Sequence, residues 1–152
     1  MQLTLALSLL ASTSPLVTLH AQSAPRGTPA EARSMLEKAV THYQQMGRAK
    51  ALADFTSKRT PFVDRDLYVF CFSPDLTVSA HGADASQVGV KIDNLKDADG
   101  FAFGTAMFEA GQQPDGGSVE YKWLNPVTKQ VEPKISFVRK VGEDVCGVGA
   151  YQ

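Results

Sequence analysis

The sequence predicts an α+β domain in which helices cover one antiparallel β-sheet. An N-terminal stretch places apolar residues three and four positions apart, which is typical of a helix. The second half contains segments rich in β-branched and aromatic residues, separated by short turn sequences. The predicted order is two helices, two strands, one helix and three strands. Short connections favour an antiparallel meander for the last three strands, and 152 residues suit one domain.

The first helix begins where capping rules place it. Thr28 is a suitable N-cap, Pro29 takes the first helical position, and Glu31 completes a capping box. Gly47 is expected to end or bend this helix. A short second helix over residues 48–55 follows, and a turn-rich connector covers residues 56–66.

Residues 66–82 are predicted to form two strands around a turn at 73–75. Residues 83–100 have no clear period, apart from one helical turn at 85–88. An amphipathic helix should follow, with Phe101, Met107 and Phe108 as core candidates, and Gly116 and Gly117 are expected to stop it. The three last strands are expected at 118–124, 130–140 and 144–151, joined by turn-forming sequences.

The first 25 residues contain no acidic residue, lysine or arginine, and Leu3 to Leu10 form an apolar stretch. This pattern predicts a signal peptide over residues 1–21 with the mature chain starting at Gln22. A buried N-terminal helix is the alternative. The predicted organisation is a signal peptide at 1–21, a short linker at 22–28 and one domain at 29–152, exported in soluble form to the periplasm.

The charge balance excludes some classes of partner. Fifteen basic and 16 acidic residues give a net charge of −1, without the basic stripe that phosphate neutralisation requires. Nucleic acid is therefore not expected as a partner. No segment of the mature chain is apolar enough to predict a membrane span.

The predicted strands at 118–124 and 130–140 contain the side chains that are candidates for binding a ligand. Alternation places Tyr121 and Trp123 on one face of the first strand, and Lys134 with Ser136 on one face of the second. A cation, a hydroxyl donor and an aromatic wall suit a small organic anion. A plain solvated sheet face is the alternative.

Two hairpin registers bring Lys134 to the aromatic face. Pairing Leu124 with Lys129 around a four-residue turn, the first choice, places Lys134 opposite Val119. A slip by two residues places Lys134 opposite Tyr121 instead. Pro133 lacks a backbone donor, so this strand is expected to be an edge or to be irregular beside Lys134.

Motifs for cofactors and catalysis are missing. The acidic residues near 93–100 lack calcium-loop spacing, and the histidines and cysteines lack zinc-ligand spacing. No redox, haem, dinucleotide or nucleophile-elbow motif occurs, so no cofactor or catalytic residue is expected. His81 follows a strand and is either structural or able to reach a ligand. An enzyme reading would pair His81 with Asp84 or Asp99 for acid–base work.

Taken together, the segments "LYVF", "AHG", "YKW", "EPKISFV" and "GVGAY" resemble the single Cache domains of type 2, over residues 29–151. The resemblance implies a PAS-like fold with a five-stranded antiparallel sheet. A long N-terminal helix covers one face and a ligand pocket lies on the other. These modules form the outer part of chemoreceptors and histidine kinases, and they bind small carboxylates and related metabolites.

The resemblance also implies roles for particular residues. Tyr121, Trp123 and Lys134 fall on strands that line the family's pocket, and His81 and Phe103 lie in segments that close it. Many relatives carry tyrosine where this chain has Phe137, which our face assignment directs to the core.

Cys71 and Cys146 occupy apolar strands, where relatives commonly carry aliphatic residues. An oxidising compartment would allow them to form a disulfide if the two strands are neighbours. Two buried thiols are the alternative.

We therefore expect a non-enzymatic, periplasmic small-molecule-binding module. Its ligand would be a small carboxylate or related metabolite, and the segment 82–104, called here the closing segment, would open and close over it. A membrane sensor kinase, chemoreceptor or transporter would detect the change. The alternative is a ligand-free interaction module whose exposed sheet face binds a protein.

Overall fold

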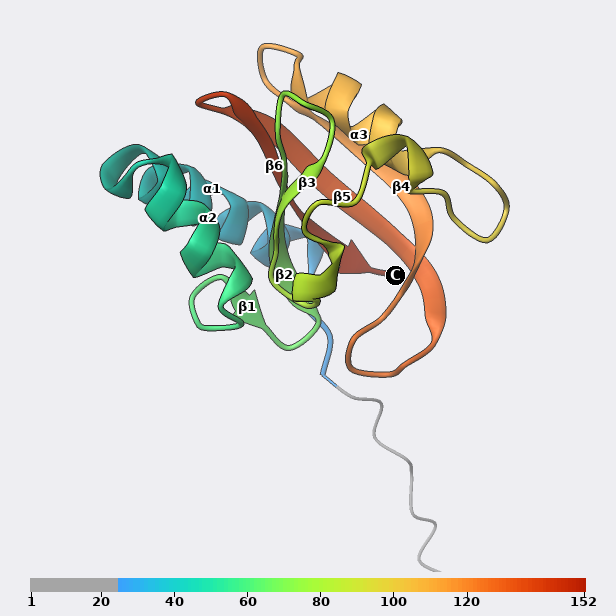
Figure 1. Cartoon of the computed structure of the whole chain (residues 1–152). Helices are drawn as coiled ribbons and strands as arrows, with labels where there is room; N and C mark the ends of the chain where they lie inside the picture. Colours follow the sequence, from blue (N-terminus) through green and yellow to red (C-terminus); the bar gives the residue numbers. More distant parts are fainter. Residues whose placement is uncertain (1–24) are drawn as a thin grey trace, which may run out of the picture.

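The structure is a computed structural model of the chain, and it describes residues 25–152 (Figure 1). The predicted signal peptide lies outside these residues and stays a prediction. Helix α1 spans Pro29–Met46, and α2 spans Arg48–Thr56. The predicted capping box is present, because the Glu31 N–H donates to Thr28 Oγ1 at 3.2 Å and the Thr28 N–H donates to the Glu31 carboxylate at 2.7 Å. Gly47 separates the helices with a φ of 79°, a conformation that favours glycine.

The sheet is antiparallel, with strand order β1-β2-β6-β5-β4, and β3 also pairs with β2. β1 and β3 lie end to end along one edge of β2, because β1 pairs with residues 67–68 and β3 with residues 70–72. The predicted sheet of five strands is thus confirmed, and a two-residue strand extends it within the predicted connector. The strands are β1 Val63–Asp64, β2 Leu67–Phe72, β3 Val78–His81, β4 Gly117–Leu124, β5 Val131–Val141 and β6 Asp144–Tyr151.

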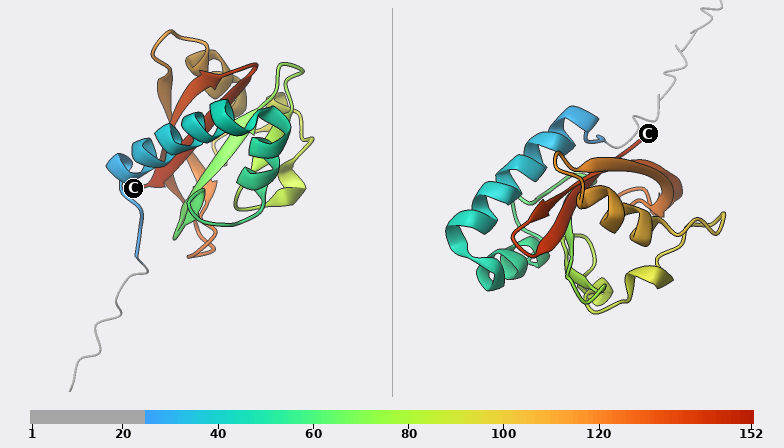
Figure 2. Two further views of the ribbon diagram at one scale, coloured as in Figure 1. Left: turned by 90° about the vertical axis from the view of Figure 1, so that its left-hand side faces the viewer. Right: turned by 90° about the horizontal axis from the view of Figure 1, so that it is seen from above.

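The sheet separates two hydrophobic clusters. α1 and α2 lie on one side of it and α3 on the other (Figure 2). The helix-side cluster joins α1 and α2 to alternate residues of β2 and β6, namely Val69 and Cys71 with Cys146, Val148 and Ala150. The cavity-side cluster joins the other residues of the sheet to the closing segment and to α3, which spans Phe103–Gly111. Alternation along each strand therefore assigns neighbouring residues to different clusters.

The closing segment contains two short 3-10 turns, η1 at Ala85–Gln87 and η2 at Ile92–Asn94. The first was predicted and the second was not. Helix α3 differs from the prediction at both ends. It ends at Gly111 before the glycines expected to stop it, and Phe101 lies ahead of it with 43% of its surface exposed, so the assignment of Phe101 to the core was wrong.

A buried carboxylate ties the helices to the sheet. Asp144, at the start of β6, accepts from the Tyr43 hydroxyl at 2.6 Å and from Arg48 Nε at 2.8 Å. It also accepts from Ser79 Oγ on β3 at 2.9 Å. Because buried carboxylates are stable only when paired and hydrogen-bonded, these contacts fix α1, α2 and β3 against one strand end.

The prediction that Pro133 marks an edge strand or an irregular site was wrong, because β5 is an inner strand and pairs regularly with β4. β5 lies between β4 and β6, and its pairing with β4 runs without a shift from residue 131 to 138. The pairing of β5 with β6 ends at Lys134 opposite Tyr151, and the next residue of the chain, Gln152, donates its N–H to the Pro133 carbonyl at 2.9 Å. Pro133 has no N–H to return to the Gln152 carbonyl, which accepts from Arg26 Nη1 at 3.1 Å instead. The missing donor of Pro133 is therefore replaced by a side chain.

Within residues 25–152, none of the helices combines the length and apolar character that a membrane crossing requires.

Candidate functional site

A small cavity lies between the sheet and the closing segment, on the side opposite α1. Its volume is about 20 Å³, which is room for about one water molecule. Its walls come from β2, β3, β4, α3 and the closing segment. The lining residues are Tyr68, Phe70, Phe72, Val78, His81, Gln87, Leu95, Phe103, Met107, Tyr121 and Trp123.

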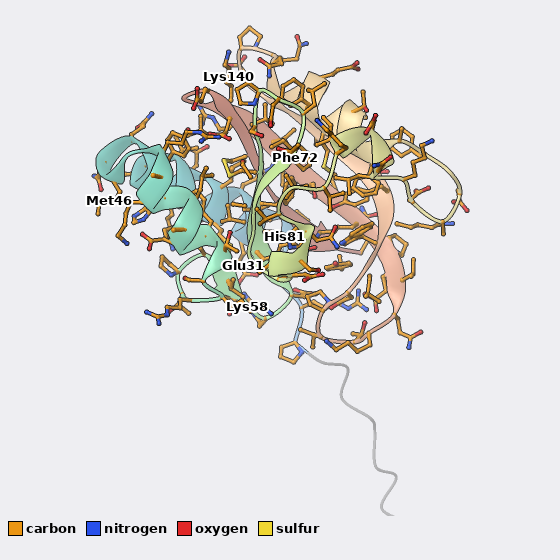
Figure 3. The ribbon with its side chains drawn as sticks, in the orientation of Figure 1. Glu31, Met46, Lys58, Phe72, His81 and Lys140 are labelled. Atoms are coloured by element: carbon orange, nitrogen blue, oxygen red, sulfur yellow. A yellow bond between two sulfur atoms is a disulfide. The ribbon has the colours of Figure 1, made fainter. Side chains whose placement is uncertain are left out.

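Strand β2 supplies the aromatic floor. Tyr68, Phe70 and Phe72 are two residues apart, so all three side chains emerge on the cavity side of the sheet. Figure 3 labels Phe72 at the end of β2 and His81 at the end of β3. The run "LYVFCF" therefore contributes to both clusters, with its aromatic residues turned toward the cavity.

The β4–β5 hairpin adopts the second of the two registers considered from the sequence. Tyr121 lies opposite Lys134, and Leu124 lies opposite Val131. The first choice, Leu124 opposite Lys129, was wrong because the turn is longer than four residues. The Asn125 N–H donates to the Gln130 carbonyl at 2.8 Å and closes a six-residue turn.

Asn125 is fully buried, and its side chain holds that wider turn. Its Oδ1 accepts from the Val127 N–H at 2.9 Å, and its Nδ2 donates to Glu132 at 2.9 Å. The predicted faces are correct: Phe137 belongs to the helix-side cluster, while Tyr121 and Val138 belong to the cavity-side cluster.

Lys134 has no exposed surface. Its Nζ lies 3.4 Å from the Tyr151 hydroxyl, 3.9 Å from the centre of the Tyr68 ring and 4.5 Å from the centre of the Tyr151 ring. Burial lowers the pKa of the ammonium to about 7, against the weaker opposing effect of the Asp66 carboxylate. The amine is therefore poised between its charged and neutral forms near neutral pH.

Two glycines of β6 make room for this arrangement. A Cβ at Gly149 would collide with Lys134 Cε and with Ser136 Oγ. A Cβ at Gly147 would come within 2.6 Å of the Phe70 ring. The alternating glycines in "GVGAY" thus leave space on the cavity side only, where the lysine and an aromatic ring fill it.

The other predicted residues of β4 and α3 pack together in the wall of the cavity. The Phe103 ring stacks on Tyr121 with centroids 4.4 Å apart, and it meets the Trp123 ring edge-on at 5.0 Å. The Tyr121 hydroxyl lies 3.0 Å from Ser136 Oγ, and burial raises the pKa of Tyr121 well above its usual value. Tyr121 therefore stays a neutral hydroxyl that can donate or accept.

His81 lines the cavity with a defined tautomer. Its Nδ1 accepts from the Asp84 backbone N–H at 3.0 Å, so in the neutral ring Nε2 carries the proton. Burial and the nearby Lys134 lower the pKa of His81 to about 4. The ring is therefore neutral at pH 7, with one N–H donor available.

The acid–base pairs considered from the sequence are not formed. The Asp84 carboxylate accepts from the Ser86 N–H and hydroxyl, and Asp99 pairs with Lys122 Nζ at 2.7 Å. Neither carboxylate bonds to His81. Within residues 25–152, no group of three or more histidines, cysteines and acidic residues could hold a metal ion.

The five ligand-binding residues predicted from the sequence lie on one side of the sheet. Tyr121, Trp123, His81 and Phe103 line the cavity, while Lys134 lies behind the Tyr68 ring. Sequence reasoning missed Tyr68, Phe70, Phe72 and Tyr151 as site residues. The alternation of aromatic residues in β2 was the signal that could have identified the first three.

Cys71 and Cys146 lie directly opposite each other on β2 and β6, and the structure joins them by a disulfide. The pair belongs to the helix-side cluster, away from the cavity. It crosslinks segments that are 75 residues apart in the sequence.

An antiparallel sheet with helices on one face and a small aromatic cavity on the other is the architecture of PAS-like sensor domains. The chain belongs to the family of single Cache domain 2, whose model matches residues 8–151. This match begins ahead of the predicted mature start at Gln22. Cache domains are extracytoplasmic sensory modules. No curated protein is similar enough in sequence to match the chain.

Solved structures that share the fold include the following three. A methyl-accepting chemotaxis protein from Vibrio parahaemolyticus has a TM-score of 0.69 and 21% identity over 80% of this chain and 86% of its own. A Cache chemosensory domain described for carboxylic acid recognition has a TM-score of 0.59 and 21% identity, over 80% and 86%. A periplasmic sensor domain of a chemotaxis protein has a TM-score of 0.60 and 20% identity, over 80% and 88%.

Proposed function

We propose that this protein is a non-enzymatic, exported sensory module that binds a small carboxylate or a related metabolite. The observation that supports this most directly is Lys134, whose amine has no exposed surface and no paired carboxylate beside an aromatic cavity. Moving an ammonium out of water costs on the order of several kcal/mol of free energy unless an opposite charge is buried beside it. A ligand carboxylate would provide that counter-charge.

The remaining wall groups suit the rest of such a ligand. Tyr121 supplies a hydroxyl and His81 an N–H donor, both of which can hydrogen-bond carboxylate oxygens. Phe103 and Trp123 supply an apolar wall for a short carbon chain. A carboxylic acid recognised by a Cache domain of the same fold is in keeping with this assignment.

The size of the cavity implies that ligand entry requires movement. About 20 Å³ is too small for a carboxylate of several heavy atoms. Backbone hydrogen bonds join the first half of the closing segment to β3 and the turn before it, as between the Gly89 N–H and the Val78 carbonyl at 2.8 Å. Its second half is held to β4 by side chains: the Asp97 carboxylate accepts from the Lys122 N–H at 3.3 Å, and Asp99 pairs with Lys122 on the surface. Exposed pairs of this kind contribute about 1 kcal/mol or less. The second half of the closing segment is therefore the part we expect to move, and a membrane sensor kinase, chemoreceptor or transporter would detect its position.

A titration of the purified protein tests the proposal. Acetate, propionate, lactate, succinate and a panel of amino acids are screened by thermal shift, and hits are measured by calorimetry. A ligand at a hundred times its dissociation constant should add about 2.7 kcal/mol to the free energy of unfolding. Lys134→Met should abolish binding, whereas Lys140→Met, a change at an exposed lysine of the same strand, should not. Binding that survives Lys134→Met would contradict the assignment of the lysine.

The alternative, a ligand-free interaction module that uses the Lys134 face of the hairpin, needs correction. Lys134 has no exposed surface and lies against the Tyr68 and Tyr151 rings, so a protein partner cannot contact it directly. An interface would instead suit the hairpin tip, where Leu124, Val127 and Val131 are each more than 40% exposed. Failure of all ligands in the screen would favour that tip as the functional surface.

A further inference from the structure

We propose that the site takes up a proton together with its anionic ligand, so that the module responds to the concentrations of both. This inference rests on the proposed function, because it concerns the same cavity. Occupancy of the site would then depend on both the ligand concentration and the pH, through the charge of Lys134.

The first argument is the absence of a partner charge around the amine. The ion pairs of residues 25–152 all involve other side chains. The groups that surround Lys134 are neutral phenols, an imidazole and one more distant carboxylate. They are Tyr68 from β2, His81 from β3, Tyr121 from β4, Tyr151 from β6 and Asp66 ahead of β2.

Asp66 is almost fully buried, but it is not a paired carboxylate for the Lys134 amine. One of its oxygens accepts from the Gly27 N–H at 2.7 Å, and the other accepts from Asn125 Nδ2 at 3.3 Å. Its carboxylate is thus engaged in holding the chain entry and the hairpin turn. It acts on Lys134 only at a distance, and burial remains the larger influence on the amine.

The second argument is that the neighbours cannot buffer the ligand's charge. Burial holds the pKa values of Tyr68 and Tyr121 well above the usual phenol value, so both stay protonated across the physiological range. His81 is committed to the Asp84 N–H through Nδ1, and its pKa of about 4 keeps it neutral. The lysine, with a pKa of about 7, is the group whose charge the ligand can change.

The linkage has a definite direction. A carboxylate beside Lys134 stabilises the ammonium and therefore raises the pKa of the lysine above its value in the free protein. Between these two pKa values the complex carries a proton that the free protein lacks. In that range the affinity for the anion should fall up to about tenfold for each unit of increasing pH. Below about pH 6 the amine is charged in both states, and the dependence should disappear.

Calorimetry measures this proton directly. Acetate, propionate, lactate and succinate are each titrated into the protein at pH 6.0 and pH 8.5, in pairs of buffers with different ionisation enthalpies. The difference in heat between paired buffers gives the number of protons taken up per ligand. These ligands are fully ionised at pH 8.5, so their own titration does not contribute. We expect more than half a proton per ligand at pH 8.5 and nearly none at pH 6.0.

Two variants assign the proton. The number of protons taken up per bound ligand should persist in His81→Gln, where binding itself should weaken because a donor is lost, and in the exposed control Lys140→Met. Loss of uptake in His81→Gln, with ligand still bound, would place the proton on the imidazole and overturn the inference. Binding without uptake at either pH would also overturn it while leaving the proposed function intact. Absence of binding by every ligand at both pH values would instead overturn the proposed function.

Discussion

Lys134→Met should stabilise the ligand-free protein at neutral pH. The substitution keeps an unbranched side chain of similar length and removes a charge that has no exposed surface. Replacing even a buried ion pair by apolar side chains of similar volume is often neutral or stabilising by about 1–4 kcal/mol, and an ammonium without a paired carboxylate has less attraction to lose. The lysine would then be a group that costs stability and is useful only when ligand is bound.

The pH dependence gives this prediction a magnitude. The pKa of Lys134 is about 7 in the folded protein and 10.5 for an ordinary lysine. Between these values the unfolded chain binds more protons, so the free energy of unfolding rises with pH. From pH 7 to 9.5 the rise attributable to this group is about 3 kcal/mol, at 1.36 kcal/mol per unit. Measurements should stop at pH 9.5, because Tyr68 and Tyr121 have raised pKa values and reverse the trend where free phenols ionise.

Urea unfolding at pH 7.0, 8.25 and 9.5 provides the assay. Trp123 is the single tryptophan and reports on the site by its fluorescence. The advantage of Lys134→Met over the wild type should shrink by about 3 kcal/mol across this range. Lys140→Met should follow the wild type, since that lysine is exposed. Parallel curves for the wild type and Lys134→Met would refute the reasoning, because they would show that burial does not disfavour the ammonium.

Three further changes probe the scaffold by the same urea assay. Cys71→Ala with Cys146→Ala removes a crosslink across 75 residues and should cost about 4 kcal/mol; a loss below about 1 kcal/mol would contradict its role. Asp144→Asn should cost about 2 kcal/mol, because a buried carboxylate loses its charge beside the Arg48 guanidinium. Glu143→Gln, on the exposed side of the same arginine, should cost less than about 1 kcal/mol. Equal losses in the two variants would contradict this ranking. Gly149→Ala should cost about 1–3 kcal/mol and weaken ligand binding, because the added methyl displaces the lysine; unchanged binding would show that the space is not needed.

The sequence was sufficient to predict the architecture because its local signals agree with the tertiary contacts. The capping box at Thr28, the glycine at 47 and the aromatic strand of residues 67–72 all lie where the pattern placed them. β1 was missed because a two-residue strand has no period to detect. It forms only because β2 offers a free edge at Leu67 and Tyr68.

The site was predictable only in part, because the decisive contacts are non-local. The side of the sheet that Lys134 occupies followed from alternation, but its register depended on Asn125. That residue looked like an ordinary turn former, and its burial against Asp66 widens the turn. The predicted meander placed the strand of Tyr151 beside that of Lys134, but burial of Lys134 also depends on Tyr68, whose strand the sequence could not place in the sheet.

The alternation of the two clusters has a consequence for how such a domain can diversify. Residues that determine the shape of the cavity, such as Phe70 and Gly147, alternate with residues that hold the helices, such as Cys71 and Val148. A lineage can therefore exchange cavity-facing residues and acquire a new chemical preference while the α1 interface remains intact. Ligand preference and stability thus depend on alternate residues of the same strands, so a substitution that changes the ligand preference need not reduce the stability of the fold.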